Sequence, residues 1–230
     1  MIPKIIHYCW FGGKPVPEKV KKFIDTWKKN CPDYEIKQWN ETNFDVHFLS
    51  YTKEAYHHKK YAFVSDVARL YALVNEGGIY MDTDVELIKP LDTLLHNQAI
   101  LGFEGTQYIA TNFIGSEPQH PFFIEFLKSY DTRVFLKEDQ TFDQTTNVEV
   151  LTQLLKKTGK LKLTGEEQII NGIHLYPTEY FSPYDYITGR LYKTKNTYSI
   201  HWFDKSWTNQ NKLRTIISQM YHRLIGSKMK

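Results

Sequence analysis

The chain has few of the features that define several large classes of protein. Its 230 residues include only two cysteines, Cys9 and Cys31, which have neither metal-site spacing nor the number that a disulfide framework needs. No stretch approaches the roughly 18 consecutive apolar residues of a membrane-spanning helix. The first residues also lack the apolar segment of a signal peptide. We therefore expect a cytoplasmic protein in a reducing compartment.

Excess charge is also lacking. The formal net charge is only +3, so the chain does not carry the strongly basic surface of a nucleic-acid-binding protein, and we expect no nucleic-acid partner. Aromatic residues, in contrast, are abundant, with 16 Tyr, 14 Phe and 5 Trp. Most of them must form core, but aromatic rings also suit nucleobases and the flat faces of sugars.

Hydrophobic periodicity predicts alternating strands and helices, as in an α/β fold with a mostly parallel central sheet. Strands are expected at residues 5–8, 34–39, 79–88 and 99–103. Helices are expected at residues 18–30, 61–76 and 122–130, and after the capping box of Thr146 and Glu149 as far as Gly159. Residues 160–200 read as short strands and turns. Without repeats or linkers, residues 1–210 form one predicted domain, followed by a tail at 211–230.

The most informative segment is Gly77–Leu87. Two glycines end the helix at 61–76, a short apolar run follows, and Asp82 and Asp84 come directly after it. The predicted strand continues through them, so both carboxylates should point to the same side. A hard divalent cation such as Mn²⁺ or Mg²⁺ is the usual partner of such a pair. An Asp-x-Asp pair alone is a weak signal, since exposed acidic turns are common, but the preceding helix end and strand favour a metal site.

Three further positions are candidates for ligand binding. Asp66 and Arg69 are three apart on the helix at 61–76 and hence neighbours; they form either a structural ion pair or a pair that binds sugar hydroxyls and diphosphate. Trp10 precedes two glycines that would let its loop approach a flat ligand closely, although it could equally be a core residue at a strand end.

The segment 201–207 is the other dense cluster. His201 can ligate Mn²⁺ through its imidazole, or it can pack beside the neighbouring tryptophans as core. Glu104 and Asn112, after the strand at 99–103, are weaker candidates for groups near a reacting atom.

Several motifs together resemble glycosyltransferase family 32, which includes bacterial capsular-polysaccharide transferases and yeast mannosyltransferases. The resemblance covers residues 1–115 and rests on the segments Ile2–His7, Trp10–Gly13, Ser65–Arg69 and Gly77–Asp84. It implies a single-domain, Rossmann-like GT-A fold, a nucleotide-sugar donor such as a UDP-sugar, a divalent metal (Mn²⁺ or Mg²⁺) and retention of anomeric configuration. The implied reaction moves a hexose to a glycan or lipid-linked acceptor in surface polysaccharide synthesis.

The resemblance also implies roles for individual residues. Asp82 and Asp84 match the metal and diphosphate motif, Asp66 and Arg69 match the pair that contacts the donor, and Trp10 lies where the family places an aromatic near the nucleobase.

The segment 201–207 resembles the C-terminal signature of retaining GT-A enzymes. In that signature His201 would be a third metal ligand, and Lys205 or Trp207 would meet the diphosphate. The expected catalytic contribution is stabilisation of the departing diphosphate by the metal, Lys205 and Arg69.

Two other functions fit parts of the pattern. A phosphatase of the haloacid-dehalogenase type also uses a strand-tip Asp-x-Asp, but it needs Thr or Val where this chain has Glu86. A non-catalytic carbohydrate-binding module would use the aromatics but would leave the four charged candidates unexplained.

The tail has the pattern of a basic amphipathic helix. Its apolar positions are Leu213, Ile216, Ile217, Met220 and Leu224. Its cations include Lys212, Arg214, Arg223, Lys228 and Lys230. The pattern is typical either of weak peripheral attachment to an anionic inner membrane face or of a helix docked on the domain.

Overall fold

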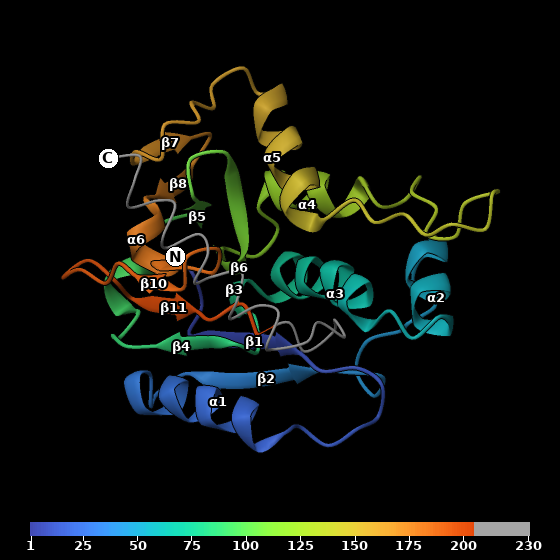
Figure 1. Ribbon diagram of the computed structural model, residues 1–230, viewed down its shortest axis with the longest axis horizontal. Helices are drawn as coiled ribbons and strands as arrows, with labels where there is room; N and C mark the ends of the chain where they lie inside the picture. The colour runs from blue at the N-terminus through green and yellow to red at the C-terminus, as the bar shows by residue number, and fades with distance from the viewer. Residues whose placement is uncertain (205–230) are drawn as a thin grey trace.

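The computed structural model describes residues 1–204 and has a seven-stranded mixed sheet at its centre (Figure 1). In spatial order β2-β1-β3-β6-β5-β8-β7, its strands are β2 (Glu35–Trp39), β1 (Ile5–Cys9), β3 (Gly78–Met81), β6 (Tyr108–Ser116), β5 (Ala99–Glu104), β8 (Ile173–Tyr176) and β7 (Gln168–Ile170). Two small sheets pair β4 (Val85–Leu87) with β11 (Ser199–His201), and β9 (Tyr184–Asp185) with β10 (Arg190–Leu191). The helices are α1 (Glu18–Asn30), α2 (Ser50–His57), α3 (Tyr61–Glu76), α4 (Pro121–Lys128), α5 (Asn147–Lys157) and α6 (Thr178–Phe181), with a 3₁₀ turn at Asp92–Leu94.

Most strands of the central sheet point the same way. β1 is parallel to β2 and β3, and β5 is parallel to β8. β6 runs antiparallel to β3 and β5, and β7 runs antiparallel to β8, so β6 and β7 are the two reversed strands among seven. The predicted α/β class is confirmed. β6 was missed because Thr111 and Asn112 interrupt its apolar pattern.

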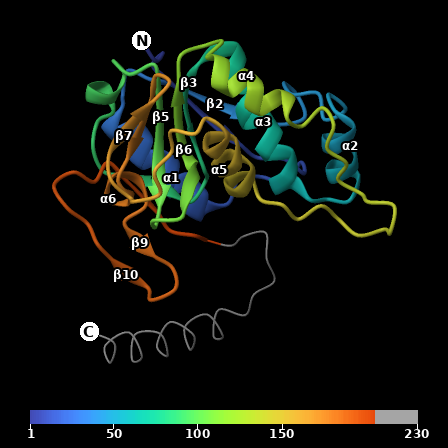
Figure 2. The same ribbon diagram turned by 90° about the horizontal axis from the view of Figure 1, so that it is seen from above.

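Helices cover both faces of the sheet. Figure 2 shows α3, α4 and α5 together on one side and α6 on the other. The alternation along β3 explains how both faces become core: Tyr80 packs into the cluster under α2–α5, whereas Ile79 and Met81 pack into the second cluster with α1. Each inner strand therefore stabilises two hydrophobic layers at once.

The link from α3 to β3 places the acidic motif. Gly77 follows the last residue of α3 with φ 66°, and its amide donates to the Leu73 carbonyl. A Cβ at this position would lie 2.7 Å from the backbone nitrogen of Pro118, so both the dihedral and the packing require glycine. The predicted helix end is confirmed, and the chain turns directly into the sheet.

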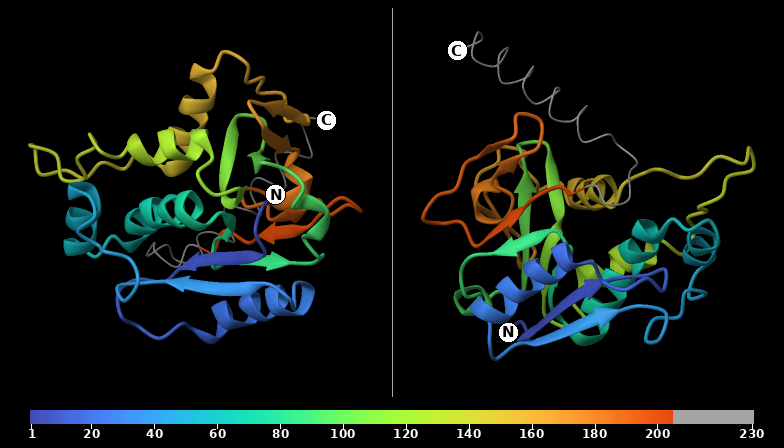
Figure 3. Two further views of the ribbon diagram at one scale, coloured as in Figure 1. Left: turned by 180° about the vertical axis from the view of Figure 1, so that it is seen from behind. Right: turned by 60° about the horizontal axis from the view of Figure 1, so that its bottom comes forward.

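The second half contains the predicted helices and short strands, while α2 is a helix of the first half that the sequence pattern did not predict. The capping box at the start of α5 forms as expected, with Thr146 accepting from the Glu149 amide. Figure 3 shows the segment between α4 and α5 reaching past the helices to α2. There the Glu54 carboxylate accepts hydrogen bonds from the amides of Phe135 and Leu136, at 3.1 and 2.9 Å.

Within residues 1–204, no helix is both long and apolar enough to cross a membrane. The predicted tail helix at 211–230 and the predicted domain boundary at 210 lie outside the described residues.

Candidate active site

The Asp-Thr-Asp motif lies in a tight turn between β3 and β4. β3 ends at Met81, and the amide of Val85 donates across the turn to the Asp82 carbonyl at 3.1 Å. The prediction that one extended strand carries both carboxylates is therefore wrong. β4 leaves the central sheet because Val85 is buried under α1, where its carbonyl accepts from the Trp27 indole at 2.8 Å.

The turn still gathers a set of metal-ligating groups. One ligating atom each from Asp82, Asp84 and His201 lie within 4.8 Å of one another. Among the described residues, no other three His, Cys, Asp or Glu side chains come together in this way. Two carboxylates and an imidazole form a donor set that suits Mn²⁺.

Arg69 is the buried cation beside this turn. Its side chain lies one turn after Asp66 on α3, with a terminal nitrogen 3.0 Å from the Asp66 carboxylate and 3.4 Å from that of Asp82. Another terminal nitrogen donates to the Thr111 carbonyl at 2.8 Å, and the guanidinium lies 4.5 Å from the centre of the Tyr80 ring. The two residues predicted to be neighbours on one helix face are thus paired and packed together.

The groups around Arg69 determine its pKa and that of Asp66. Only 6% of the residue is exposed, and burial by itself would lower the pKa of the guanidinium. The nearby Tyr80, Asp82 and Asp66 outweigh burial, so the pKa of Arg69 is raised and the side chain stays cationic. Burial raises the pKa of Asp66, an effect that Arg69 opposes.

Tyr80 is a site residue that the sequence analysis treated only as part of an apolar strand. Its hydroxyl donates to the Asp82 carboxylate at 2.9 Å, while its ring packs against Arg69. The available signal was its position two residues before Asp82, which places both side chains on the same side of the chain.

His201 reaches the turn from the far end of the described chain. β11 pairs antiparallel with β4, and His201 lies opposite Val85. An imidazole nitrogen then lies 3.3 Å from the Asp84 carboxylate, which also accepts from the Asp204 amide at 2.7 Å. Strand pairing therefore places the histidine next to a residue far from it in the sequence.

The short distance between His201 and Asp84 shifts the pKa of each group. Burial would lower the pKa of His201, but Asp84, with Asp82 and Glu104, more than compensates, and the pKa is raised. Burial would also raise the pKa of Asp84, but His201 and the Asp204 amide reverse this and the pKa is lowered. Without a metal the two side chains therefore favour the charged pair.

The two weaker candidates lie close to the turn. The Asn112 carbonyl accepts from the Asp82 amide at 2.9 Å, and within residues 1–204 the buried Asn112 side-chain nitrogen has no hydrogen-bond partner. Glu104, at the end of β5, has a pKa raised by burial and by Asp82, while His201 opposes the shift. An amide donor and a carboxyl group thus border the metal-ligating atoms.

Trp10 lies between the two alternatives that the sequence left open. Its ring is partly buried against the second core cluster, and its indole N–H donates to the Lys14 carbonyl at 2.8 Å. The loop packs closely on the start of α3, since a Cβ at Gly12 would lie 2.4 Å from the Tyr61 ring. Lys205 and Trp207 lie outside the described residues, and their roles remain predictions.

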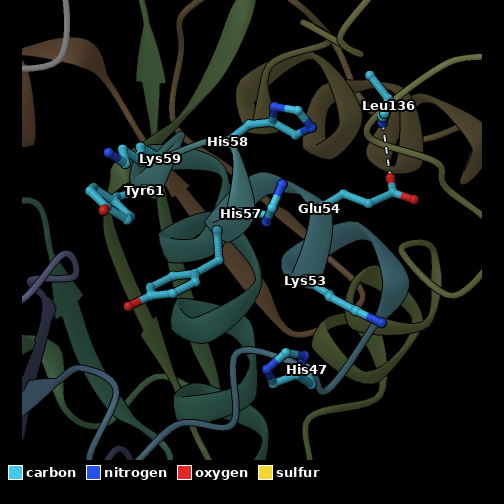
Figure 4. Close-up of a pocket in the computed structure, with 9 residues that line it drawn as sticks. His47, Lys53, Glu54, His57, His58, Lys59, Tyr61 and Leu136 are labelled. Carbon is cyan, nitrogen blue, oxygen red and sulfur yellow. Dashed lines mark hydrogen bonds between the residues drawn. The ribbon is translucent and has the colours of Figure 1, made fainter. Parts of the chain in front are cut away.

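A cavity of about 640 Å³ lies apart from the acidic turn, between α2 and the segment that follows α4. Figure 4 shows its lining, which includes His47, His57 and His58 from α2 and its flanks. Glu54 also lines the cavity, but its carboxylate already accepts hydrogen bonds from two backbone amides. The cavity contains none of the proposed metal ligands.

Comparisons with known proteins relate this chain to glycosyltransferases. Residues 17–101 match the model of the glycosyltransferase sugar-binding region containing the DXD motif. An uncharacterized glycosyltransferase of Acanthamoeba polyphaga mimivirus is 28% identical over 93% of this chain and 86% of its own length. Inositol phosphoceramide mannosyltransferase 3 of Schizosaccharomyces pombe is 31% identical over 56% of this chain, but the match spans only 37% of that protein. Among solved structures, the PaToxG glycosyltransferase superposes with a TM-score of 0.50 at 21% identity, covering 68% of this chain and 69% of that one.

These matches confirm the resemblance that the sequence motifs indicated. The chain is a glycosyltransferase with a GT-A type fold, and it carries the DXD sugar-binding region. The comparisons therefore favour neither alternative function, the phosphatase or the non-catalytic binding module.

Proposed function

We propose that this glycosyltransferase is metal-dependent and retaining, and that it moves a hexose from a nucleotide sugar to a glycan or lipid-linked acceptor in surface polysaccharide synthesis. The proposal rests on one observation above all: ligating atoms of Asp82, Asp84 and His201 lie within 4.8 Å of one another beside the buried Arg69. Such a set suits a divalent ion that also binds phosphate oxygens.

The residues divide into ligands and a group that positions them. Asp82, Asp84 and His201 would hold the ion, which would supply positive charge to the departing diphosphate. Arg69 is almost fully buried and already bonded to Asp66, Asp82 and the Thr111 carbonyl. We therefore assign it the role of fixing the Asp82 carboxylate in place.

The donor and acceptor are inferred more broadly. A UDP-sugar is the donor that the family resemblance favours, and the mannosyltransferase among the relatives makes a mannose donor the first alternative. The same relative is named for inositol phosphoceramide, which supports an acceptor with a lipid part. The implied Trp10 contact would place the nucleobase at the loop after β1.

A donor screen tests this proposal. Purified full-length protein is incubated with Mn²⁺ and each of several UDP- and GDP-hexoses, and release of nucleoside diphosphate is followed. One donor should be cleaved well above the others, and NMR of the first-formed sugar product should show the anomeric configuration of the donor. Release from no donor at any metal concentration would contradict the proposed activity, whereas an inverted product would contradict only retention.

A further inference from the structure

The β9–β10 hairpin and the residues that follow it form an unusual exposed surface. Figure 2 shows this hairpin extending away from the central sheet. Tyr186, Ile187, Leu191 and Tyr192 are 40%, 48%, 43% and 55% exposed. Within residues 1–204, these seven positions from 186 to 192 hold four of the nine large hydrophobic residues that are strongly exposed. Tyr186 and Ile187 lie in the turn, and Leu191 lies opposite Tyr184 at the base. Such a concentration of exposed apolar side chains on one hairpin indicates an interaction surface.

The same segment carries charge of one sign. Arg190, Lys193 and Lys195 are exposed, and no acidic residue occurs between Asp185 and Asp204. The Asp185 carboxylate, moreover, already accepts hydrogen bonds inside the hairpin from Thr188, at 2.6 and 3.2 Å. Three cations therefore lie among and directly after the exposed apolar residues, in a stretch without acidic residues.

We propose that residues 186–195, the docking hairpin, bind the surface of an anionic lipid bilayer. Tyrosine favours the boundary between lipid and water, exposed Ile and Leu side chains gain from entering it, and Lys and Arg are attracted by anionic headgroups. The docking hairpin offers all three within ten residues. This inference deepens the proposed function, on which it rests for the idea of a lipid-linked acceptor.

The hairpin is also joined to the candidate site. The Tyr186 ring lies 4.8 Å from that of Phe203, which in turn lies 3.9 Å from the ring of His201. At the base of the hairpin, Tyr184 packs on Trp202 with ring centres 5.2 Å apart. A bilayer bound at the tip would therefore lie on the side of the molecule where His201 meets the acidic turn. An acceptor held in that bilayer would need only a short sugar portion to reach the site.

Charge argues against the other occupants of this surface. Residues 205–230 contain six Lys and Arg residues and no acidic residue, so their sequence offers no charge complementary to the docking hairpin. A second copy of the hairpin has the same sign. An acidic protein would also be attracted, but exposed tyrosine and aliphatic side chains beside cations are the combination that favours the boundary of an anionic bilayer.

Vesicle binding by the full chain tests the proposal. Wild type is sedimented with vesicles of phosphatidylcholine alone and with vesicles that contain phosphatidylserine, at low and high salt. Binding should require phosphatidylserine and weaken with salt. The variant R190Q/K193Q/K195Q should bind about 100-fold more weakly, because each cation near an anionic surface contributes about 5-fold. I187S/L191S should also weaken binding, through lost insertion of apolar side chains.

Matched variants separate the hairpin from net charge. K156Q/K157Q/K162Q removes three exposed cations from α5 and the loop after it, and V134S/I169S removes two exposed apolar side chains elsewhere. Both should bind within about 2-fold of wild type. The proposal is overturned if the hairpin variants bind as tightly as wild type, if wild type ignores phosphatidylserine vesicles, or if the hairpin captures an acidic protein without binding vesicles.

Donor hydrolysis without vesicles separates this inference from the proposed function. Mn²⁺-dependent release of nucleoside diphosphate should be the same in wild type and in R190Q/K193Q/K195Q, since these side chains lie outside the metal-ligating set. Loss of vesicle binding with intact hydrolysis supports the inference. If no donor is hydrolysed by wild type, the proposed function fails, whereas the vesicle result still decides whether the hairpin docks on lipid.

Discussion

The two carboxylates of the acidic turn, only two residues apart, are held in different ways. Asp82 is at the arginine end of the site, which comprises Asp66, Arg69, Tyr80 and Asp82; there its charge meets a buried, permanent cation and a tyrosine hydroxyl. Asp84 is at the histidine end, which comprises Asp84, His201 and Asp204; there its charge meets an imidazole that titrates and a backbone amide.

The difference separates a fixed part of the site from an adjustable one. The arginine end is assembled within one helix–strand unit and should hold its charge at any ordinary pH, because arginine does not deprotonate. The histidine end is assembled across 120 positions of sequence and depends on the pairing of β4 with β11. A ligand set with one rigid carboxylate and one titratable partner can accept a metal by releasing a proton from the imidazole.

Arg69→Met should break the arginine end and have the largest effect on stability. It leaves two carboxylates, Asp66 and Asp82, without their buried cation, and removing one partner of a buried ion pair costs about 3–5 kcal/mol. Urea denaturation measures the change in the free energy of unfolding. Lys37→Met is the control, since its pair with Glu76 is about one-third exposed and should contribute at most about 1 kcal/mol. Equal small losses in both variants would contradict the proposed importance of the buried pair.

Trp10→Ala should have the next largest effect, on binding rather than on folding. If the ring stacks on the nucleobase, donor affinity should fall by about 1–3 kcal/mol, the scale of base–aromatic stacking. Calorimetric titration with the nucleoside diphosphate measures this, and the melting temperature serves as control. A large loss of melting temperature with unchanged affinity would instead make Trp10 a core residue.

The smallest predicted effect is a pH dependence confined to the histidine end. Because the pKa of His201 is raised above 6.5, its contribution to stability is fully present below about pH 6.5 and is lost as pH rises through the raised value. The pKa of Asp84 is lowered from 3.8, so its contribution is present above that pH and is lost on acidification.

Melting temperatures in EDTA, from about pH 5 to about pH 9, check this prediction. The stability difference between wild type and His201→Gln should shrink as pH rises. In a separate titration without EDTA, the Mn²⁺ affinity of wild type should increase with pH, because proton and metal compete for the imidazole. A stability difference that grows with pH would have the wrong sign for this pair.

The same contrast explains how far the sequence could predict the site. The end of α3, the neighbouring Asp66 and Arg69, and the apolar run of β3 follow from local rules of helix capping, helix spacing and strand burial, and all three were confirmed. That His201 would share a metal with Asp82 and Asp84 could be proposed only from resemblance, since no local rule shows that β11 pairs with β4. The extended course through Asp82 and Asp84 was predicted wrongly, because the departure of β4 depends on burial of Val85 under α1.

Metal dependence of Asp82→Asn and Asp84→Asn tests the central proposal most directly. Donor hydrolysis is measured for wild type and both variants after EDTA treatment, and again after Mn²⁺ is restored. Wild type should lose activity in EDTA and recover it with Mn²⁺, while each variant should remain at least about 10²-fold less active at matched metal, the scale of one preorganised electrostatic group. Folding of each variant is confirmed by circular dichroism. Full wild-type activity in EDTA, together with undiminished activity of Asp84→Asn, would contradict a metal site at Asp82, Asp84 and His201.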